Sequence, residues 1–385
     1  MNTRSEYLKA LRREATHTLT WAPNFDWWYD VNTANATIPA EYRGMTAHEI
    51  SRAVGGAIWQ RVEIVRWVAD ASVTTENLRQ DDLGIDITHT PVGDLRAAWQ
   101  QASDFSRSWV CVEHPVKSLD DLPALRYTLE AGHYELDTRD YDRQREEVGD
   151  DGIVLTCLPE VPFIRFAKVD VGYLQAYYLL EDHPREVAAI LQAYERNFLE
   201  AYRLAAQGPC EVVSNNDNMD QCTCPPDYFQ RYAVPFYQQT AASLHAGGKL
   251  AQGHWCGQLH RLLPLMPACG LDIIEAMTPY PMSQVDMPAA MELLEGKIAV
   301  QGGIPSIYMC EQGCTRDELA CYIEDLLDKV GHRRGFVLGM GDNVPANADF
   351  ARVRLIGEIV AAFNKQRRRG EEESDELPSI ISYLI

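Results

Sequence analysis

The stretch KLAQGHWCGQLHRLLPLMPACGLDIIEAMTP, from Lys249 to Pro279, contains one complete strand–helix–strand unit. Residues 249–257 form a short, largely apolar run that ends in glycine, and 271–279 form a second such run. Between them, residues 258–270 have the apolar spacing of a helix and end at Gly270. A helix between two short strands predicts that the strands are parallel, because the helix carries the chain back to the starting edge.

The same alternation continues on both sides of this unit. It predicts strands at 152–159, 210–217, 298–305 and 335–345, and helices at 184–208, 226–248, 287–297, 315–331 and 348–366. Toward the amino end we expect a strand at 18–30, a helix at 46–70 and a hairpin whose turn is 91–94. This number of units predicts an α/β fold, a (β/α)₈ TIM barrel with N-terminal additions and a hairpin insertion at about 72–125.

Residues 1–365 are expected to form a single TIM-barrel domain. The stretch KQRRRGEEESDELP carries a basic block followed by an acidic one, which is typical of a solvated linker. We therefore expect 366–385 to be a charged linker followed by the apolar tail SIISYLI.

Composition excludes several classes of partner. The 385-residue chain has a net charge of −21, which disfavours nucleic acids and anionic membranes. The first residues contain no apolar signal region, and no run approaches the ~18 apolar residues of a membrane span. A cytoplasmic protein with ten reduced cysteines is therefore expected, without a disulfide framework.

His254 and Cys256 are the first candidates for chemistry. Residues two apart on a strand share a face, so both side chains point the same way at the carboxyl end of their strand. In a barrel that end faces the active-site mouth, and imidazole and thiolate are both good zinc ligands. Glu275 closes the neighbouring strand and could complete three ligands, although His-x-Cys also occurs as unrelated core residues.

Other cysteines compete for this role. Cys222 and Cys224 lie in a loop after a predicted strand, and Cys310 and Cys314 have Cys-x₃-Cys spacing before a helix. Neither pair has a second pair at zinc-finger spacing, so ordinary free thiols are the simpler interpretation.

Substrate contacts are expected at the same mouth. Trp27 and Trp28 belong to an aromatic group near the end of the first strand and could enclose a flat aromatic substrate, unless they fill the core. Asn216 and Asp217 end the strand 210–217 and could orient a polar group, or simply cap the following loop. We assign Glu275 and Asp217 as candidate catalytic residues.

Several segments resemble the uroporphyrinogen decarboxylase superfamily. They are GHWCGQLHRLLPLMPACGLDIIEAMTP, GKIAVQGGIPS, GFVLGMGDNVPANADFARV and, near the amino end, IPAEYRG. The resemblance covers the carboxyl-terminal two-thirds and implies a single TIM barrel. It also implies one of two chemistries, porphyrinogen decarboxylation or corrinoid-linked methyl transfer.

The sequence departs from the decarboxylases in the region that binds their substrate. Their Arg-rich segment after the first strand is replaced here by residues 24–37, which contain no arginine. His-x-Cys is the feature of the methyltransferase branch, whose zinc has a third, downstream Cys. That Cys is missing, because Gly341 stands at the aligned position with Asp342 beside it, so Glu275 or Asp342 is the expected oxygen ligand.

The segments THTPVGDL and VEHPVKSLDDLPALRYTLE look closest to the methyl-donor:corrinoid methyltransferases, especially O-demethylases. The implied reaction moves a methyl group from a small methylated donor, favoured as an aryl methyl ether, to cobalt(I) of a corrinoid. Zinc would activate the ether oxygen. No corrinoid-binding signature is found, so a corrinoid-binding partner protein carrying cobalamin is expected, and a homodimer is possible.

The alternatives remain a uroporphyrinogen decarboxylase-like decarboxylase and a methylcorrinoid:thiol methyltransferase. A zinc hydrolase would usually show His-x-His or H-E-x-x-H, and neither motif occurs. A non-catalytic scaffold has no feature in its favour.

Overall fold

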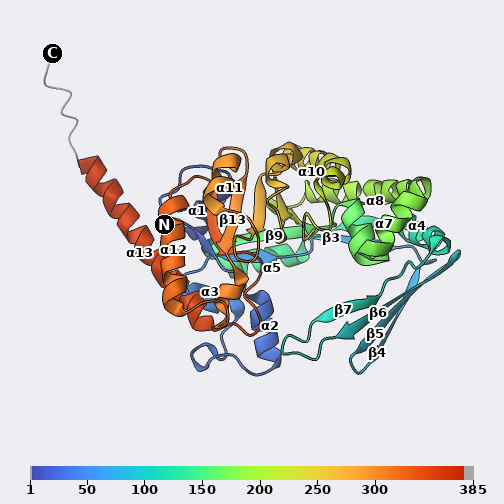
Figure 1. Cartoon of the computed structure of the whole chain (residues 1–385), viewed down its shortest axis with the longest axis horizontal. Helices are drawn as coiled ribbons and strands as arrows, with labels where there is room; N and C mark the ends of the chain where they lie inside the picture. Colours follow the sequence, from blue (N-terminus) through green and yellow to red (C-terminus); the bar gives the residue numbers. More distant parts are fainter. Residues whose placement is uncertain (1, 377–385) are drawn as a thin grey trace, which may run out of the picture.

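A computed structural model describes residues 2–376, and Figure 1 shows its central barrel. Eight strands form one sheet in the order β1-β14-β13-β12-β11-β10-β9-β2, and every adjacent pair is parallel. The two end strands approach each other where Ala57 N–H donates to the carbonyl of Trp21 at 2.7 Å. The predicted TIM barrel is confirmed, with strands β1 (Trp21–Ala22), β2 (Ile58–Arg61), β9 (Gly152–Leu158), β10 (Val212–Asn215), β11 (Leu250–His254), β12 (Ile273–Met277), β13 (Ala299–Ile304) and β14 (Phe336–Met340).

Alternate residues of each barrel strand face the lumen. The lower lumen is filled by a compact cluster of mostly small and branched side chains with the ring of Trp59, as barrel packing requires. Its members on the barrel strands, together with Ala57 just before β2, are Ala22, Trp59, Ile153, Leu155, Val212, Ile273, Ala299 and Val337. The residues two positions further along these strands therefore face the upper lumen, near the strands' carboxyl ends.

Helix α1 (Thr3–Leu11) covers the amino end of the barrel. Tyr7, Leu8 and Leu11 belong to the lumen cluster and are almost fully buried. The Tyr7 hydroxyl donates to Oε1 of Gln301 on β13 at 2.6 Å. This N-terminal addition therefore seals the end of the barrel opposite to the predicted site.

The outer layer consists of helices that pack on the barrel strands (Figure 1). Their termini follow local sequence signals: Thr315, for example, caps α12 by accepting from the Glu318 N–H, and the Glu318 carboxylate accepts in return. The main helices are α8 (Pro184–Ala205), α10 (Val234–Ala246), α11 (Met287–Leu294), α12 (Arg316–Val330) and α13 (Phe350–Glu376). No helix of the described residues is long and apolar enough to cross a membrane.

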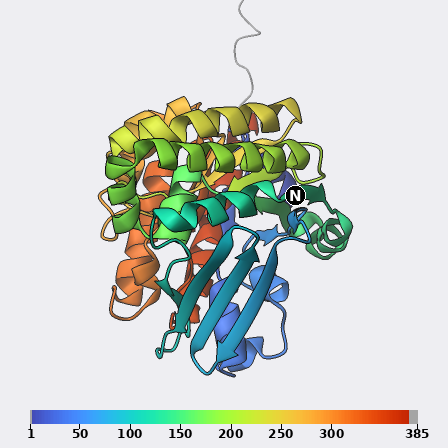
Figure 2. The same ribbon diagram turned by 90° about the vertical axis from the view of Figure 1, so that its right-hand side faces the viewer.

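A four-stranded antiparallel sheet projects from the barrel (Figures 1 and 2). Its strands are β4 (Thr74–Gln80), β5 (Leu83–Thr90), β6 (Gly93–Gln101) and β7 (Trp109–Glu113). Residues 91–92 connect β5 and β6 at the turn predicted from the sequence. The loop between β6 and β7 contacts the C-terminal end of helix α2 (Asp26–Ala34). There Asn35 Nδ2 donates to the carbonyl of Phe105 at 3.2 Å.

Three predicted elements are wrong in type. Residues 46–70 form α3 (Ala47–Ala53), β2 and β3 (Val65–Ala69) instead of one helix, because Gly55 adopts φ +69° and ends the helix. The expected strand 18–30 is strand only at β1 and then becomes α2. The expected helix 258–270 contains a 3₁₀ helix, Leu263–Cys269, since Pro264 and Pro267 interrupt α-helical hydrogen bonding.

The predicted C-terminal linker begins as a helix. Helix α13 continues through residues 366–376, and Figure 1 shows this end leading away from the barrel. The remaining part of the expected tail, 377–385, lies outside the described residues.

Trp28 was predicted to bind substrate, but it belongs to the core. Its side chain is only 2% exposed. Its ring stacks on Phe350 of α13 at a centroid distance of 4.0 Å, and Phe25 contacts both rings edge-on. Trp27, its neighbour on α2, is 38% exposed.

We expect Trp28→Ala to destabilise the protein by about 3–5 kcal/mol, because it removes a large buried ring and leaves a cavity. Trp27→Ala is the matched control and should change the free energy of unfolding by no more than about 0.5 kcal/mol. Chemical denaturation measures both values. Equal effects of the two substitutions would contradict this placement of Trp28.

Candidate metal centre

His254 and Cys256 extend from the end of β11 toward the lumen. Between them, Trp255 points outward and is fully buried. Its indole Nε1–H donates to the Tyr237 hydroxyl at 3.1 Å, and its ring contacts Phe229 edge-on. This outward anchor fixes the strand end, so the two flanking side chains are held on the opposite face.

His254 is oriented by Glu275 on the adjacent strand. The two residues are in register, and both side chains are buried. His254 Nδ1 lies 2.5 Å from Glu275 Oε2, so an Nδ1–H donated to the carboxylate leaves Nε2 for another partner. Nε2 faces Asp342, whose Oδ1 is 3.8 Å away.

Three different donor atoms converge at this point. One ligand atom each from His254, Cys256 and Asp342 lies within 4.8 Å of the others. Nitrogen, sulfur and carboxylate oxygen together suit zinc, and three protein ligands leave a position for substrate. The predicted pair is therefore brought together, and Asp342 is its oxygen partner.

Glu275 was also predicted as a ligand, and the structure gives it a different place. Its carboxylate is not a member of the donor group and instead holds the imidazole of His254. A carboxylate behind a ligating histidine fixes the ring orientation and raises its basicity. Glu275 is therefore a positioning residue here, which is a correction of the predicted direct ligand.

Close packing explains why Gly341 contributes no side chain. A Cβ at this position would lie 2.7 Å from Thr278 Oγ1 and 3.0 Å from Thr278 Cβ. Thr278 cannot easily move away, because its hydroxyl donates to the Gly341 carbonyl. The space that a side chain at 341 would need is occupied, and the donor is supplied by Asp342, one residue later.

Two asparagines hold the Asp342 segment. Asn24, which follows β1, donates its amide to the Asp342 carbonyl at 3.0 Å, and its own carbonyl accepts from the Val344 N–H at 2.7 Å. Asn343 Nδ2 donates to Asp342 Oδ1 at 2.8 Å. Sequence reasoning missed both roles, because these contacts join residues more than 300 positions apart or depend on a loop conformation.

A β-bulge follows Glu275. The register with β13 shifts between Glu275 and Met277, and the intervening Ala276 adopts φ +66°. A left-handed conformation is uncommon for a residue with a Cβ and costs about 1–2 kcal/mol. Such strain is often found beside functional sites, and here it turns Thr278 toward the Gly341 segment.

The charges of the centre are coupled. Burial alone lowers the pKa of His254, but the Glu275 carboxylate and Cys256 together raise it well above its ordinary value. The pKa of Asp342 is raised, mainly by burial. The charge of His254 lowers this pKa, whereas the Glu275 carboxylate raises it further. Without a cation, this arrangement therefore favours a protonated imidazole between two acids, so a bound cation would compete with that proton.

Asp217 was predicted to contact substrate and to act in catalysis, but its side chain is fully buried. One carboxylate oxygen accepts from the Val161 N–H at 2.8 Å and the other from the Tyr237 hydroxyl at 2.5 Å. Tyr237 in turn accepts from Trp255. Asp217 is thus an anchor behind the end of β11, and direct contact with substrate is not compatible with its position.

The other candidates are more scattered. Asn216 is exposed, and its backbone carbonyl accepts from Lys168 Nζ at 3.2 Å, so substrate binding by Asn216 and by the exposed Trp27 stays a prediction. Cys222 is exposed, whereas Cys224 is buried. Cys310 and Cys314 contact Asn347 and Arg352, respectively. None of these thiols belongs to the donor group.

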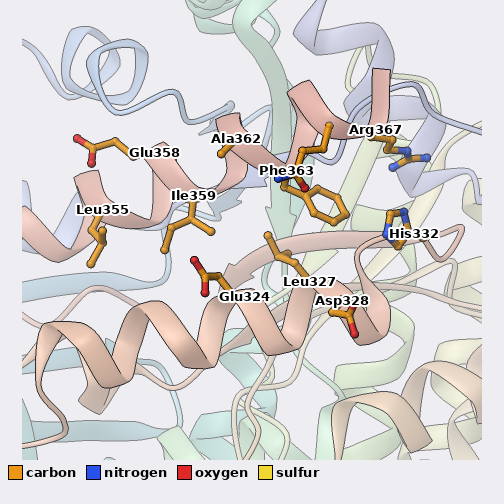
Figure 3. A pocket seen from close by; sticks show the side chains of 11 residues that line it. Glu324, Leu327, Asp328, His332, Leu355, Glu358, Ile359, Ala362, Phe363 and Arg367 are labelled. Atoms are coloured by element: carbon orange, nitrogen blue, oxygen red, sulfur yellow. The ribbon is translucent and has the colours of Figure 1, made fainter. Parts of the chain in front are cut away.

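A cavity of about 940 Å³ lies elsewhere, between α12 and α13 (Figure 3). Leu327 and Phe363 line it together with the acidic residues Glu324 and Glu358. It contains none of the lumen-facing residues at the strand ends. Since chemistry in TIM barrels takes place at the carboxyl ends of the strands, this cavity is not the active site.

We expect Cys256→Ala and Asp342→Ala each to weaken zinc binding by at least about 100-fold, because each removes a ligand. Glu275→Gln should weaken it by about 10- to 100-fold through the loss of histidine orientation. Cys222→Ala removes an exposed thiol and is the control. Competition titration with a zinc chelator measures these affinities; wild-type affinity in Cys256→Ala would contradict the assignment.

The position of the third donor gives a second prediction. In the Asp342→Ala background, Gly341→Cys should not restore zinc affinity, because its Cβ meets Thr278. Asp342→Cys introduces a sulfur ligand at a position that already carries a side chain, so this variant should still bind zinc. The same titration tests both variants, and rescue by Gly341→Cys would show that the packing argument is wrong.

Asp217 predicts a dependence of stability on pH. Burial raises the pKa of Asp217 to about 6, although the Tyr237 and Val161 hydrogen bonds oppose this. In the unfolded chain the pKa of an Asp carboxyl is about 3.9. When folding raises that pKa, the carboxyl stabilises the fold fully at pH values below the unfolded pKa, and this stabilisation is lost as pH rises through the folded pKa. Denaturation between pH 4 and pH 7 should therefore show a loss with pH that is absent in Asp217→Asn. Parallel profiles of the two proteins would contradict the prediction.

Comparison with known proteins places this geometry in a family. The chain matches the model of the family described as Uroporphyrinogen decarboxylase (URO-D) over residues 165–363, which is more than half of its length. No curated protein sequence matches the chain.

Among solved structures, a methyltransferase from Methanosarcina mazei aligns with a TM-score of 0.59 at 13% identity, over 94% of this chain and 99% of that chain. A D-psicose 3-epimerase from Clostridium cellulolyticum H10, solved with D-tagatose, aligns with a TM-score of 0.32 at 11% identity, over 59% and 84% of the two chains. The first match confirms the fold, and the family match confirms the resemblance seen in the sequence. The chain belongs to the uroporphyrinogen decarboxylase family.

Proposed function

We propose that this protein is a zinc-dependent methyltransferase that moves a methyl group from a small methylated donor to cobalt(I) of a corrinoid on a separate protein. The observation that carries the proposal is the convergence of His254, Cys256 and Asp342 within 4.8 Å at the end of the barrel. The fold shared with a solved methyltransferase over 94% of the chain is compatible with it.

The favoured donor is an aryl methyl ether. Zinc held by His254, Cys256 and Asp342 would supply a Lewis acid beside the ether oxygen. The carbon–oxygen bond would break with its electron pair left on the oxygen as phenoxide, and cobalt(I) of the partner protein would supply the electron pair for its bond to the methyl carbon. Atoms and charge balance without a general base.

The chain's own residues prepare this site. Glu275 keeps the proton on Nδ1 of His254, so Nε2 is available as a donor. Asn24 and Asn343 hold Asp342 beside it. Because each group is fixed before substrate arrives, little reorganisation is needed as charge develops on the leaving oxygen.

The rim of the barrel offers a surface for a corrinoid protein. The segments after β12, β13 and β1 expose large apolar side chains: Tyr280 is 73% exposed, Met282 41%, Ile307 38% and Trp27 38%. Apolar residues on the rim of a site are typical of a protein interface. A partner seated there would bring its corrinoid over the lumen.

Incubation with cobalt(I) cobalamin and a panel of methoxyaromatics, methylamines and methyl thioethers tests the proposal. We expect methylcobalamin to form, as followed by absorbance, with methoxyaromatics as the best donors. Cys256→Ala should lose the transfer while staying folded, and Cys222→Ala should keep it. Undiminished turnover in Cys256→Ala, or no methyl transfer from any donor by zinc-loaded enzyme, would contradict the proposal.

A further inference from the structure

The end of β2 places an arginine in the barrel lumen. Ala57 and Trp59 belong to the lumen cluster, and Gln60 faces outward, where its Oε1 lies 2.7 Å from His48 Nε2. Because successive side chains on a strand alternate, Arg61 faces inward. Its guanidinium carbon lies 4.8 Å from the centroid of the Trp59 ring, which confirms this direction.

Arg61 forms no direct ion pair with a carboxylate of the described side chains. Among the side chains that the structure describes, those of residues 2–369, none forms a hydrogen bond or ion pair with its guanidinium, and the Arg61 side chain is exposed to solvent. Two other basic residues beyond β9 are neutralised: Arg165 pairs with Asp170 at 3.0 Å, and Lys168 pairs with Glu160 at 2.8 Å. The guanidinium of Arg61 is therefore held against Trp59 without a hydrogen-bonded or ion-paired carboxylate.

Its charge acts on the residues around the upper lumen. Burial raises the pKa of Cys157, and Arg61 followed by His254 lowers it. Cys157 contacts the lumen cluster from β9, so it lies between the arginine and the metal centre. Burial also raises the pKa of Asp26, and the charge of Arg61 opposes this increase. Arg61 lowers the pKa of Asp342 as well, but less than His254 does.

We propose that Arg61 binds an anionic substituent, a carboxylate, on the methyl donor and so orients its methyl group toward the metal centre. This inference rests on the proposed function, since it names the class of donor for that site. A guanidinium offers a planar pair of N–H donors that match a carboxylate, and Trp59 holds it in place. One free guanidinium fits a donor with one acidic group.

This assignment also separates the protein from tetrapyrrole decarboxylases. Residues 24–37 contain no arginine, and Arg61 is the lumen-facing cation that the adjacent strand supplies. A substrate with many carboxylates needs several such partners. The sequence prediction of a helix across 46–70 concealed Arg61, because a helix would not have placed it on the face shared by Ala57 and Trp59.

Calorimetric titration with 2-, 3- and 4-methoxybenzoate and with the matching neutral methoxybenzamides tests the inference without any turnover. We expect wild-type protein to bind at least one methoxybenzoate more tightly than its amide. Arg61→Gln should remove that preference, weakening carboxylate binding by about 10- to 100-fold while leaving amide binding unchanged. Arg61→Lys keeps the charge but lacks the planar donor pair, so it should retain part of the preference.

Arg231→Gln is the matched control, since Arg231 also stacks on an aromatic ring, that of Tyr232 at 5.1 Å, but lies on a helix after β10. Thermal unfolding and zinc content verify that each variant is intact. A carboxylate preference that persists in Arg61→Gln, or wild-type protein without such a preference, overturns the inference. Arg61-dependent binding without methyl transfer would overturn the proposed function alone, whereas transfer from neutral donors only would overturn the inference alone.

Discussion

The site depends on the hydrogen bond between His254 and Glu275. At 2.5 Å, in a buried position on adjacent strands, it fixes which nitrogen of the imidazole faces Cys256 and Asp342. Three features support it from outside the lumen: the Trp255 anchor, the buried Asp217–Tyr237 pair and the bulge at Ala276. These contacts hold the strand ends, and the strand ends position the candidate metal ligands.

The two halves of the barrel lumen differ in the residues that line them. Its lower part is apolar and closed by α1, whereas its upper part collects the polar residues of several strands. The candidate metal centre lies on one side, on β11 and after β14, and Arg61 lies at the end of β2. The proposed donor would place its carboxylate at the guanidinium and its methoxy group at the candidate metal centre.

The sequence was sufficient to predict the barrel, because short apolar strands alternate with helices along the chain. It also predicted the His254–Cys256 pair, because residues two apart on a strand share a face. It failed where conformation depends on distant contacts. Trp28 looks like a surface aromatic until Phe350 of α13 stacks on it, and Asp217 looks like a rim carboxylate until Tyr237 covers it. The choice between Glu275 and Asp342 likewise needed coordinates, since strand-end position alone does not reveal that Glu275 binds the histidine.

X-ray absorption spectroscopy at the zinc edge of the purified protein tests the central claim most directly. The account predicts a bound zinc whose nearest neighbours include one sulfur, at about 2.3 Å, together with nitrogen and oxygen at about 2.0–2.2 Å. Substitution of Cys256 by Ala should remove the sulfur signal. A protein that takes up no zinc, or a zinc surrounded by nitrogen and oxygen alone in the wild type, would contradict it.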